Sequence, residues 1–400
     1  MTASTKRNPL YKMHVLIIPS EHFVTSTCPL AGIFQSQQAN ALHESGHKVG
    51  VISPGVITPR FLFRRYEYPE FEDSNGYPVY RRYVRKFYPQ RSVSPERSIS
   101  LYQDLGLDLY MLYKRRFGKP DIIHAHNVKF AGFIAQAVRD MDTVPYIITE
   151  HSSMFRAKIL ADKWLSPIKV AYQYASARTA VSRALSNDIG RQLGFHDIDV
   201  LPNIVETNLI SGILKDNTGC DGDFVFLNIA SLDANKDQSS LIEAFAMHFQ
   251  CRRASLRIGG TGNMERHLKK LVRRLGVESQ VVFLGYLDRH SVMREMQEAD
   301  CFVLSSRQET FGVVLIEALA CGTPVIATRC GGPEDIVNED NGLLVAPGDI
   351  ISMGEAMIQM SQAKGRYEAE ALREECKTRF GKEAFIASAN QFYATSRGFH

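Results

Sequence analysis

The sequence predicts an α/β protein built from two consecutive doubly wound parallel sheets. Two observations predict this class: short apolar segments of strand length alternate with segments of helical periodicity, and this alternation stops and restarts once along the chain. The break falls near 203–222, where Asn, Ser, Gly and Asp accumulate, so we expect a linker there. No internal sequence repeat accompanies the two series, so the likeness of the halves is one of architecture.

Length and composition agree with more than one domain. The chain has 400 residues, of which 44% are hydrophobic and 22% charged, and single domains typically hold about 100–200 residues. No apolar run approaches the ~18–20 residues that span a bilayer, and the first residues lack the pattern of a secretory signal. Seven cysteines without a C-x-x-C pair argue against a disulfide framework and a zinc site. We therefore expect a cytoplasmic protein.

The first series begins with an apolar strand over 14–20, followed by a polar loop that reaches Gly32 and a helix that Gly46 terminates. A strand over 47–53 completes a strand–helix–strand unit, which is typical of a parallel sheet. The stretch 54–100 is rich in Tyr, Pro and Arg, and we expect an irregular insertion there. Further short, apolar strands are expected over 121–127, 145–151, 177–182 and 197–203.

The second series starts near 223. Strands are expected over 224–230, 254–260, 280–286, 301–306, 324–328 and 342–346. Helical patterns occupy 239–249, 263–276, 290–299 and 311–322, and an amphipathic pattern fills 382–399. In open parallel sheets ligands bind beyond the carboxyl ends of the strands. The cleft between two such domains is therefore the expected active site.

The net charge of +4 hides an asymmetry between the halves. Residues 1–205 carry 26 Lys and Arg against 17 Asp and Glu, whereas residues 206–400 carry 21 against 26. The positive excess is concentrated in 60–119. This distribution predicts different partners for the two halves, although a solvated basic surface explains it equally well.

The most informative motif runs from Glu309 to Glu317 and contains Phe311-Gly312 at the start of a predicted helix. The free amides and positive dipole end of such a helix suit a phosphate, and Gly312 allows close backbone approach. A carboxylate before the helix can accept hydrogen bonds from sugar hydroxyls, and one inside it can reach a ribose. Taken alone, the two glutamates are more simply interpreted as a cap and an ordinary helix residue.

In its context this E-x7-E motif resembles the donor half of the GT-B retaining glycosyltransferases of family 4. The motif is followed by EALACGTPVIATRCGGPEDIV and NGLLV, and preceded in family order by SLDANK (231–236), IGGTGNM (258–264) and VVFLGYL (281–287). HAHN (124–127), TEHSS (149–153), AVSRAL (180–185) and LPNIVE (201–206) are similar to the family's first half. The resemblance is strong over about 200–350 and weak over 56–119.

The resemblance implies a role for each motif residue in the second half. Glu309 matches the glutamate that holds donor-sugar hydroxyls beside the anomeric carbon, and Glu317 matches the one that binds the nucleotide ribose. The segment Phe311, Gly312 and Val313 matches the one whose backbone amides meet the sugar and the distal phosphate.

The remaining site residues are also implied by the resemblance. Lys236 matches the lysine that neutralises the diphosphate, and Gly285 lies in the 283–287 loop that cradles the base. Gly32 matches the glycine under the diphosphate, and His151 matches the first-half histidine near donor sugar and acceptor. Ser231 departs from the family, which usually places a second diphosphate-binding arginine there. Arg307 or the basic first half are candidates to replace that cation.

Two other patterns receive structural interpretations. His124 and His126 resemble a metal pair, but no carboxylate cluster accompanies them, so a structural or acceptor-lining role is favoured. Gly259, Gly260 and Gly262 resemble part of a dinucleotide fingerprint, but Glu265 stands where its third glycine would be. We therefore do not expect a nicotinamide site.

The resemblance implies a hexosyltransferase-type enzyme with an acceptor-binding domain over 1–205, a nucleotide-sugar-binding domain over 206–382, and a C-terminal helix, about 383–400, that crosses back to the first domain. The donor would be a nucleotide-diphosphate sugar and the acceptor a saccharide or lipid-linked saccharide of bacterial surface polymers. No metal, cofactor or nucleic acid is expected. The basic stretch 60–119 suggests contact with an anionic membrane on its cytoplasmic face. A GT-B sugar-nucleotide epimerase and a non-catalytic GT-B partner subunit are the alternatives.

Overall fold

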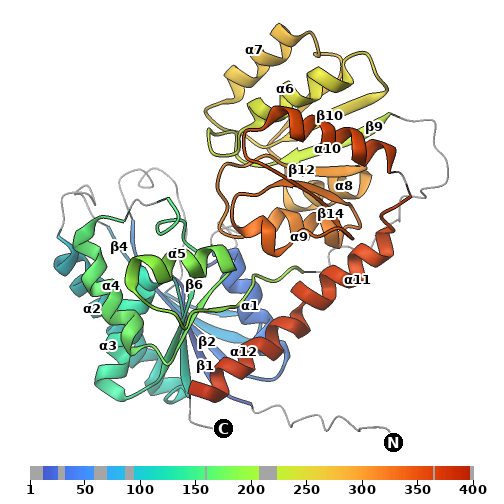
Figure 1. Ribbon diagram of the computed structural model, residues 1–400. Coiled ribbons are helices and arrows are strands. Elements are labelled where there is room, and N and C mark those ends of the chain that lie inside the picture. The colour runs from blue at the N-terminus through green and yellow to red at the C-terminus, as the bar shows by residue number, and fades with distance from the viewer. Residues whose placement is uncertain are drawn as a thin grey trace, which may run out of the picture.

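The computed structural model describes residues 12–25, 32–57, 70–85, 94–157, 160–206, 223–363 and 365–396. Within them the chain forms two α/β units, each built on its own parallel-dominated sheet (Figure 1). The strand order is β4-β2-β1-β5-β6-β7-β8 in the first sheet, with β3 added at the edge beside β4, and β11-β10-β9-β12-β13-β14 in the second. The predicted class, with two doubly wound sheets, is confirmed.

The strands of the first unit alternate with helices in the order that the sequence predicts, with additions in its middle. The strands are β1 His14–Ile18, β2 Lys48–Ile57, β3 Phe71–Ser74, β4 Tyr77–Arg85, β5 Ile122–His126, β6 Tyr146–Glu150, β7 Ala177–Ala180 and β8 Asp199–Val200. The helices are α1 Ile33–Glu44, α2 Pro95–Phe117, α3 Phe133–Asp142, α4 Leu165–Tyr174 and α5 Arg183–Leu193. Regular pairing of the strand expected over 197–203 is limited to two residues.

The expectation of an irregular insertion over 54–100 is wrong for the part that the structure describes. Strand β4 pairs in parallel with β2 along seven residue pairs, and α2 begins at Pro95. Tyr77, Val79 and Arg81 of β4 alternate along the strand and are buried on one face of the sheet. Arg81 conceals this pattern in the sequence. Its guanidinium is buried by an ion pair with Glu72 at 2.7 Å and a hydrogen bond to the Val24 carbonyl at 2.8 Å.

The first sheet is covered on both faces because its strands are apolar on both. In β1, Val15 and Ile17 pack into one core cluster, and Leu16 and Ile18 pack into another. Helices α1 and α12 contribute to the first cluster, and α2 and α3 contribute to the second. Near-continuous apolar strands in a parallel sheet are expected to be buried on both faces in this way.

The second unit follows its predicted series closely. Its strands are β9 Phe224–Ile229, β10 Ala254–Gly259, β11 Val281–Gly285, β12 Cys301–Leu304, β13 Val325–Thr328 and β14 Gly342–Val345. Its helices are α6 Gln238–Phe249, α7 Glu265–Leu275, α8 Arg289–Glu298, α9 Val313–Ala320, α10 Ile350–Gln362 and α11 Ala369–Phe380. All pairings in this sheet are parallel.

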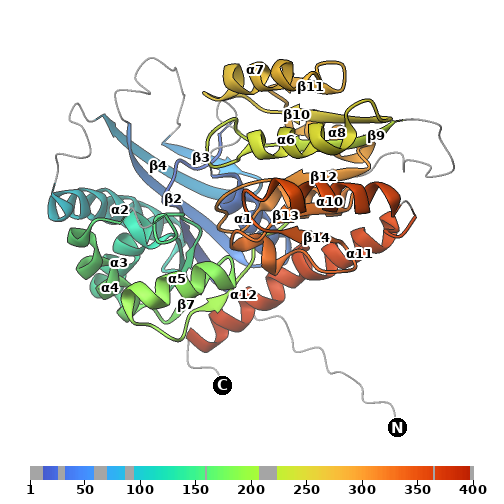
Figure 2. The same ribbon diagram turned by 45° about the horizontal axis from the view of Figure 1, so that its top comes forward.

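The last helix, α12 (Lys382–Ser396), leaves the second unit and lies along the first, as Figures 1 and 2 show. Phe385, Ile386, Ala389 and Tyr393 join the core cluster beneath β1 and α1. The Lys382 ammonium pairs with Glu44 of α1 at 2.6 Å. The chain therefore passes from the first unit to the second and returns, and the packing of α12 against the first unit holds the returning segment in place. None of the described helices is both long and apolar enough to cross a membrane.

Candidate functional site

Lys236 and Glu309 meet at the carboxyl-end edge of the second sheet. The Lys236 Nζ lies 2.6 Å from Glu309 Oε1, and the Ser306 hydroxyl donates to the same oxygen at 2.7 Å. Both charged side chains are mostly buried, with 23% and 14% of their surfaces exposed. The structure thus brings together the predicted diphosphate-binding lysine and the predicted sugar-binding glutamate, from loops that follow β9 and β12.

The loop that carries Lys236 is shaped by Asp233, a residue that the motif analysis did not single out. Its Oδ1 accepts hydrogen bonds from the Asn235 and Lys236 amides at 2.9 and 3.2 Å. Its Oδ2 accepts the Ser231 hydroxyl at 2.6 Å. Ser231, which stands where the family usually has arginine, therefore helps to fix the turn that positions Lys236. Arg307 is paired with Asp237 at 2.9 Å.

The start of α9 offers amides without a side-chain cap. Gly312 is the capping residue, has a φ of 99°, and makes no side-chain hydrogen bond because it has no side chain. Phe311 is only 2% exposed and packs edge-on against Phe380 with ring centroids 5.9 Å apart. Its side chain is thus a core element, and its backbone packs against Gly332, where a β-carbon would lie 2.2 Å from the Phe311 Cα.

Glu317 lies one turn into α9 in a largely desolvated position. Burial raises its pKa to about 7; Arg289 opposes this shift and Glu206 adds to it. Arg289, at the start of α8, pairs with Glu206 at 3.0 Å. Glu206 precedes the segment 207–222, which lies outside the described residues. The charges of Arg289 and Glu206 therefore act on the predicted ribose-binding glutamate, and Glu206 is the last described residue before the chain passes to the second unit.

The glycines around 260 serve backbone packing. A β-carbon on Gly260 would lie 1.9 Å from the Ala230 carbonyl oxygen, and one on Gly262 would lie 2.2 Å from the Leu232 oxygen. This loop therefore presses against the segment that carries Ser231. Gly285 accepts a hydrogen bond from the Gly260 amide at 2.7 Å, has a φ of 70°, and faces open space.

His151 belongs to a second cluster, in the first unit. Its Nε2 lies 3.0 Å from Nδ1 of His126, and desolvation lowers the pKa of His151 to about 4. The His151 amide donates to the Asn127 side-chain oxygen at 2.7 Å. Glu150 accepts from the Val128 and Ser152 amides, each at 3.0 Å, and burial raises its pKa to about 7.

The structure also describes the positions of Gly32 and of the His124–His126 pair, which the sequence analysis singled out. Gly32 caps α1 with a φ of 62°, and a β-carbon there would lie 2.7 Å from the His22 carbonyl oxygen. The loop 26–31 before it lies outside the described residues. His124 and His126 are stacked and engaged in hydrogen bonds to protein groups. No group of three or more His, Cys, Asp or Glu in the described ranges is arranged to hold a metal ion.

Arginines of the first unit touch the loop beside Glu309. Glu309 forms an isolated parallel bridge with Gly331, and a β-carbon on Gly331 would lie 2.3 Å from Arg156 Cζ. Arg156 belongs to the same turn region as His151 and pairs with Asp188 at 3.1 Å. Arg183 pairs with Asp335 at 2.8 Å. Arg156 and Arg183 therefore join the first unit to the segment that pairs with Glu309.

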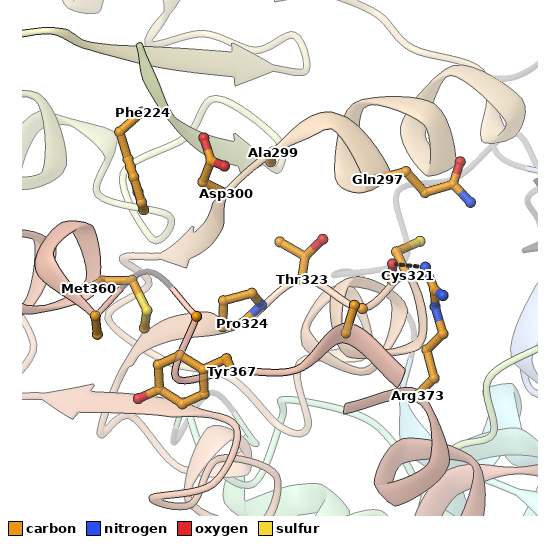
Figure 3. Close-up of a pocket in the computed structure, with 14 residues that line it drawn as sticks. Phe224, Gln297, Ala299, Asp300, Cys321, Thr323, Pro324, Met360, Tyr367 and Arg373 are labelled. Carbon is orange, nitrogen blue, oxygen red and sulfur yellow. Dashed lines mark hydrogen bonds between the residues drawn. The ribbon is translucent and has the colours of Figure 1, made fainter. Parts of the chain in front are cut away.

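A separate pocket lies at the opposite edge of the second sheet (Figure 3). It is lined by the residues where strands begin, such as Phe224, Asp300 and Pro324, and by Arg373, which donates to the Cys321 carbonyl at 2.8 Å. No residue of the predicted site lines it. The amino-end position argues against a donor site, because ligands of such sheets bind at the carboxyl ends.

Comparison with known families assigns both units. Residues 34–209 match the family model Glycosyltransferase Family 4, and residues 213–379 match Glycosyl transferases group 1. The chain is a family 4 glycosyltransferase. The putative teichuronic acid biosynthesis glycosyltransferase TuaC of Bacillus subtilis is 28% identical over 376 residues, which cover 90% of each chain. N-acetyl-alpha-D-glucosaminyl L-malate synthase of Bacillus anthracis is 25% identical over 376 residues, 91% of this chain and 93% of that protein.

Solved structures share the fold of the enzyme. Sucrose-phosphate synthase of Thermosynechococcus elongatus superposes with a TM-score of 0.72 at 21% identity, over 95% of this chain and 98% of that one. Anabaena HepE in complex with UDP superposes with a TM-score of 0.73 at 19% identity, over 96% and 100%. These structures confirm the GT-B fold that the sequence resemblance implies, and the family models and named relatives confirm the assignment as a hexosyltransferase-type enzyme.

Proposed function

We propose that the enzyme moves a hexosyl group from a nucleoside-diphosphate sugar to an acceptor hydroxyl with retained anomeric configuration. The observation that carries this proposal is the Lys236–Glu309 pair beside the uncapped start of α9. A donor carries an anionic diphosphate next to a polyhydroxylated sugar, and the pair offers one cation and one hydroxyl acceptor 2.6 Å apart. Before the donor binds, the two charges neutralise each other.

In the proposed reaction the bond between the anomeric carbon and the diphosphate oxygen breaks, and a bond to the acceptor oxygen forms on the same face. The acceptor proton passes to the departing phosphate oxygen, so no separate base is required. Lys236 and the amides of Gly312 and Val313 stabilise the negative charge that develops on the diphosphate. Glu309 orients the sugar hydroxyls, and Glu317 binds the ribose. His151, neutral because of its lowered pKa, acts by hydrogen bonding.

The missing family arginine at Ser231 points to a cation from elsewhere. Both candidate arginines form an ion pair, Arg307 with Asp237 and Arg156 through Nη1 with Asp188. The Nε of Arg156 is buried without a hydrogen-bond partner, and its guanidinium lies against Gly331, next to the backbone of Glu309. We propose that Arg156 supplies the second positive charge when the donor is bound. No metal ion is included in this proposal, so an excess of chelator should leave turnover unchanged.

The names of the relatives support a role in bacterial cell-surface polysaccharide or glycolipid synthesis. TuaC is named for teichuronic acid biosynthesis, and another relative is named a phosphatidylinositol mannoside mannosyltransferase. We propose a saccharide or lipid-linked saccharide acceptor, held by the first unit.

The experiment is a panel of UDP-, GDP- and ADP-sugars scored first by thermal shift, since a true donor stabilises the folded state by mass action. Nucleotide release is then measured with and without saccharide acceptors, and the product anomer is read by NMR. Acceptor-dependent release with retained configuration supports the proposal. Acceptor-independent release of an epimer would identify an epimerase instead, and absence of release from every donor would favour a non-catalytic partner subunit.

The described structure limits the surface that could contact an anionic membrane to a smaller part of the basic stretch 60–119. Within 60–119, Arg81 is buried, Arg82 pairs with Glu70 and Asp108, and Lys114 pairs with Asp142. Residues 60–69 and 86–93 of this stretch lie outside the described residues. Arg115 and Arg116, at the end of α2, are exposed. We propose that this end contacts acidic lipid headgroups. Co-sedimentation with phosphatidylglycerol vesicles but not phosphatidylcholine vesicles, reduced in R115E/R116E, supports it; equal sedimentation with both would refute it.

A further inference from the structure

A continuous chain of buried hydrogen bonds runs from the C-terminal helix into the first sheet. The Tyr393 hydroxyl lies 2.9 Å from His124 Nδ1, and His124 Nε2 lies 2.7 Å from the Thr149 hydroxyl. The Thr149 hydroxyl lies 2.7 Å from that of Thr179, which donates to the Ile148 carbonyl at 3.1 Å. The chain joins α12, β5, β6 and β7, although Tyr393 lies 269 residues from His124 in sequence.

The end of this chain fixes the direction of every bond in it. A carbonyl oxygen only accepts, so Thr179 gives its single hydroxyl hydrogen to Ile148. Thr149 must then donate to Thr179, and its oxygen must accept from His124 Nε2–H. His124 Nδ1 is left as an acceptor, so the Tyr393 hydroxyl donates to it. Burial keeps His124 neutral, because it lowers the pKa of this histidine to about 3.

His124 in turn supports the site histidine. Its ring stacks on that of His126 with centroids 4.3 Å apart and an interplanar angle of 23°. His126 is wholly buried, and its Nδ1 lies 3.0 Å from His151 Nε2. The ring of His124 is thus the surface against which His126 is held. If the His124 ring rotated, it would no longer present this face to His126, and we expect the bond from His126 to His151 to weaken.

We propose that Tyr393 is a positioning residue for His151, acting through His124 and His126. The proposal rests on the proposed function only in that His151 is taken to serve glycosyl transfer. Packing alone does not require the hydroxyl, since phenylalanine would fill the same space beside β1 and α1. A buried hydroxyl is retained at no cost only where it finds a partner, and its partner here is the first ring of the histidine series.

The test compares Tyr393→Phe with Lys382→Gln, a control on the same helix. Lys382→Gln breaks the ion pair between α12 and Glu44 but leaves every histidine contact in place. In Tyr393→Phe we expect kcat to fall about 5- to 10-fold with the donor KM nearly unchanged, and Lys382→Gln to match the wild type. In a His126→Gln background, adding Tyr393→Phe should cause no further loss, as expected of residues that act in series.

A spectroscopic readout keeps the proposal independent of activity. In protein labelled with 13C and 15N at histidine only, Tyr393→Phe should shift or broaden the His151 ring resonances, and Lys382→Gln should not. Unchanged His151 resonances in Tyr393→Phe would overturn the proposal, as would equal losses of kcat in both variants. If the wild type transfers no sugar, the proposed function fails, but the His151 resonances still decide whether Tyr393 positions this ring.

Discussion

The two parts of the site are built on opposite electrostatic principles. In the second unit, Lys236 and Glu309 are charged, paired and partly exposed. In the first unit, His151 and His126 are neutral and desolvated, and the pKa of each lies below the ordinary histidine value because of burial. One part is suited to an anionic ligand that replaces an existing ion pair. The other is suited to shaping the position of an uncharged sugar or acceptor.

The lysine–glutamate pair and the histidine pair are also held in place by different kinds of contact. The lysine–glutamate pair lies on loops whose shape is set by nearby residues, such as Asp233 and Gly312. The histidine pair depends on side chains from several strands and from α12. The first part should therefore tolerate substitution without unfolding, whereas changes in the second should affect both activity and stability.

The largest expected effect comes from Glu309→Gln. Losing the carboxylate that orients the sugar should lower turnover by about 100- to 1,000-fold, the range found for single preorganised transition-state contacts. The melting temperature should change little. The measurement is acceptor-dependent nucleotide release, with Glu374→Gln on the exposed face of α11 as the matched control. Turnover within threefold of the wild type would remove Glu309 from the site.

His151→Ala should have the next largest effect, a loss of about 10- to 100-fold in kcat, the size that a lost hydrogen bond of about 1.4–2.8 kcal/mol produces, together with a lower melting temperature. His126 would lose its ring partner, and a buried polar group left unpaired is destabilising. The exposed His267→Ala is the control and should match the wild type in both readouts. If His151→Ala lowered activity without any change in melting temperature, the contrast between the two parts would be weakened.

The pH dependence of the wild-type rate tests whether His151 is neutral in the folded enzyme. Because the pKa of His151 is lowered to about 4 by burial, this histidine should contribute no inflection between pH 5.5 and 8. A rate that falls with a pKa near 6.5 below neutrality, and that loses this limb in His151→Asn, would show a titrating, solvated histidine and contradict the structure.

Gly331→Ala tests the contact between the parts. A β-carbon there would meet the Arg156 guanidinium at 2.3 Å, so we expect a loss of about 5- to 20-fold in kcat/KM, of the size that one to two kcal/mol produces. Gly118→Ala is the matched control, because its φ of 88° is also positive but a β-carbon would meet no atom within 4 Å. Equal effects of the two substitutions would show that backbone strain alone is responsible.

The smallest expected effect concerns Glu317 and stability. Its pKa is raised to about 7 by burial, so the folded state holds a proton that the unfolded state has released above about pH 4.5. Stability should therefore fall as pH rises from about 4.5 to 7. Glu317→Gln should raise the melting temperature at pH 8 by about 2–4 °C and leave it nearly unchanged at pH 4.5. The comparison is made by calorimetry at both pH values; an equal shift at both would exclude titration as the cause.

The residues of the proposed donor side could be named from the sequence because they lie in short motifs that resemble a known family. The resemblance of the motifs to the family implies the roles of the glycine, the two glutamates and the lysine. Lys236 and Glu309 each follow a predicted strand, and ligands of such sheets bind beyond the carboxyl ends of the strands. The positions of Asp233 and Ser306 could have been inferred from the same logic, since a turn needs an acceptor for its amides. The side chains of Asp233 and Ser306 form their hydrogen bonds with residues at most three positions away in the sequence.

The first unit was predicted less well because its elements depend on distant partners. Strand β4 was missed since Arg81 occupies an inward position, and only Glu72 and the Val24 carbonyl make that acceptable. The role of Asn127 in holding the His151 amide, and that of Tyr393 beside His124, arise between segments far apart in the chain. No local spacing encodes such contacts.

The most direct test of the central claim is the affinity of the enzyme for the nucleoside diphosphate of its donor, measured by calorimetry in the wild type, Lys236→Ala and Glu309→Gln. If Lys236 is shared between the diphosphate and Glu309, Lys236→Ala should weaken binding at least tenfold. Glu309→Gln should leave it unchanged or tighten it, because the lysine no longer has a competing partner. Equal affinity in all three proteins would contradict the assignment of this pair to the donor site.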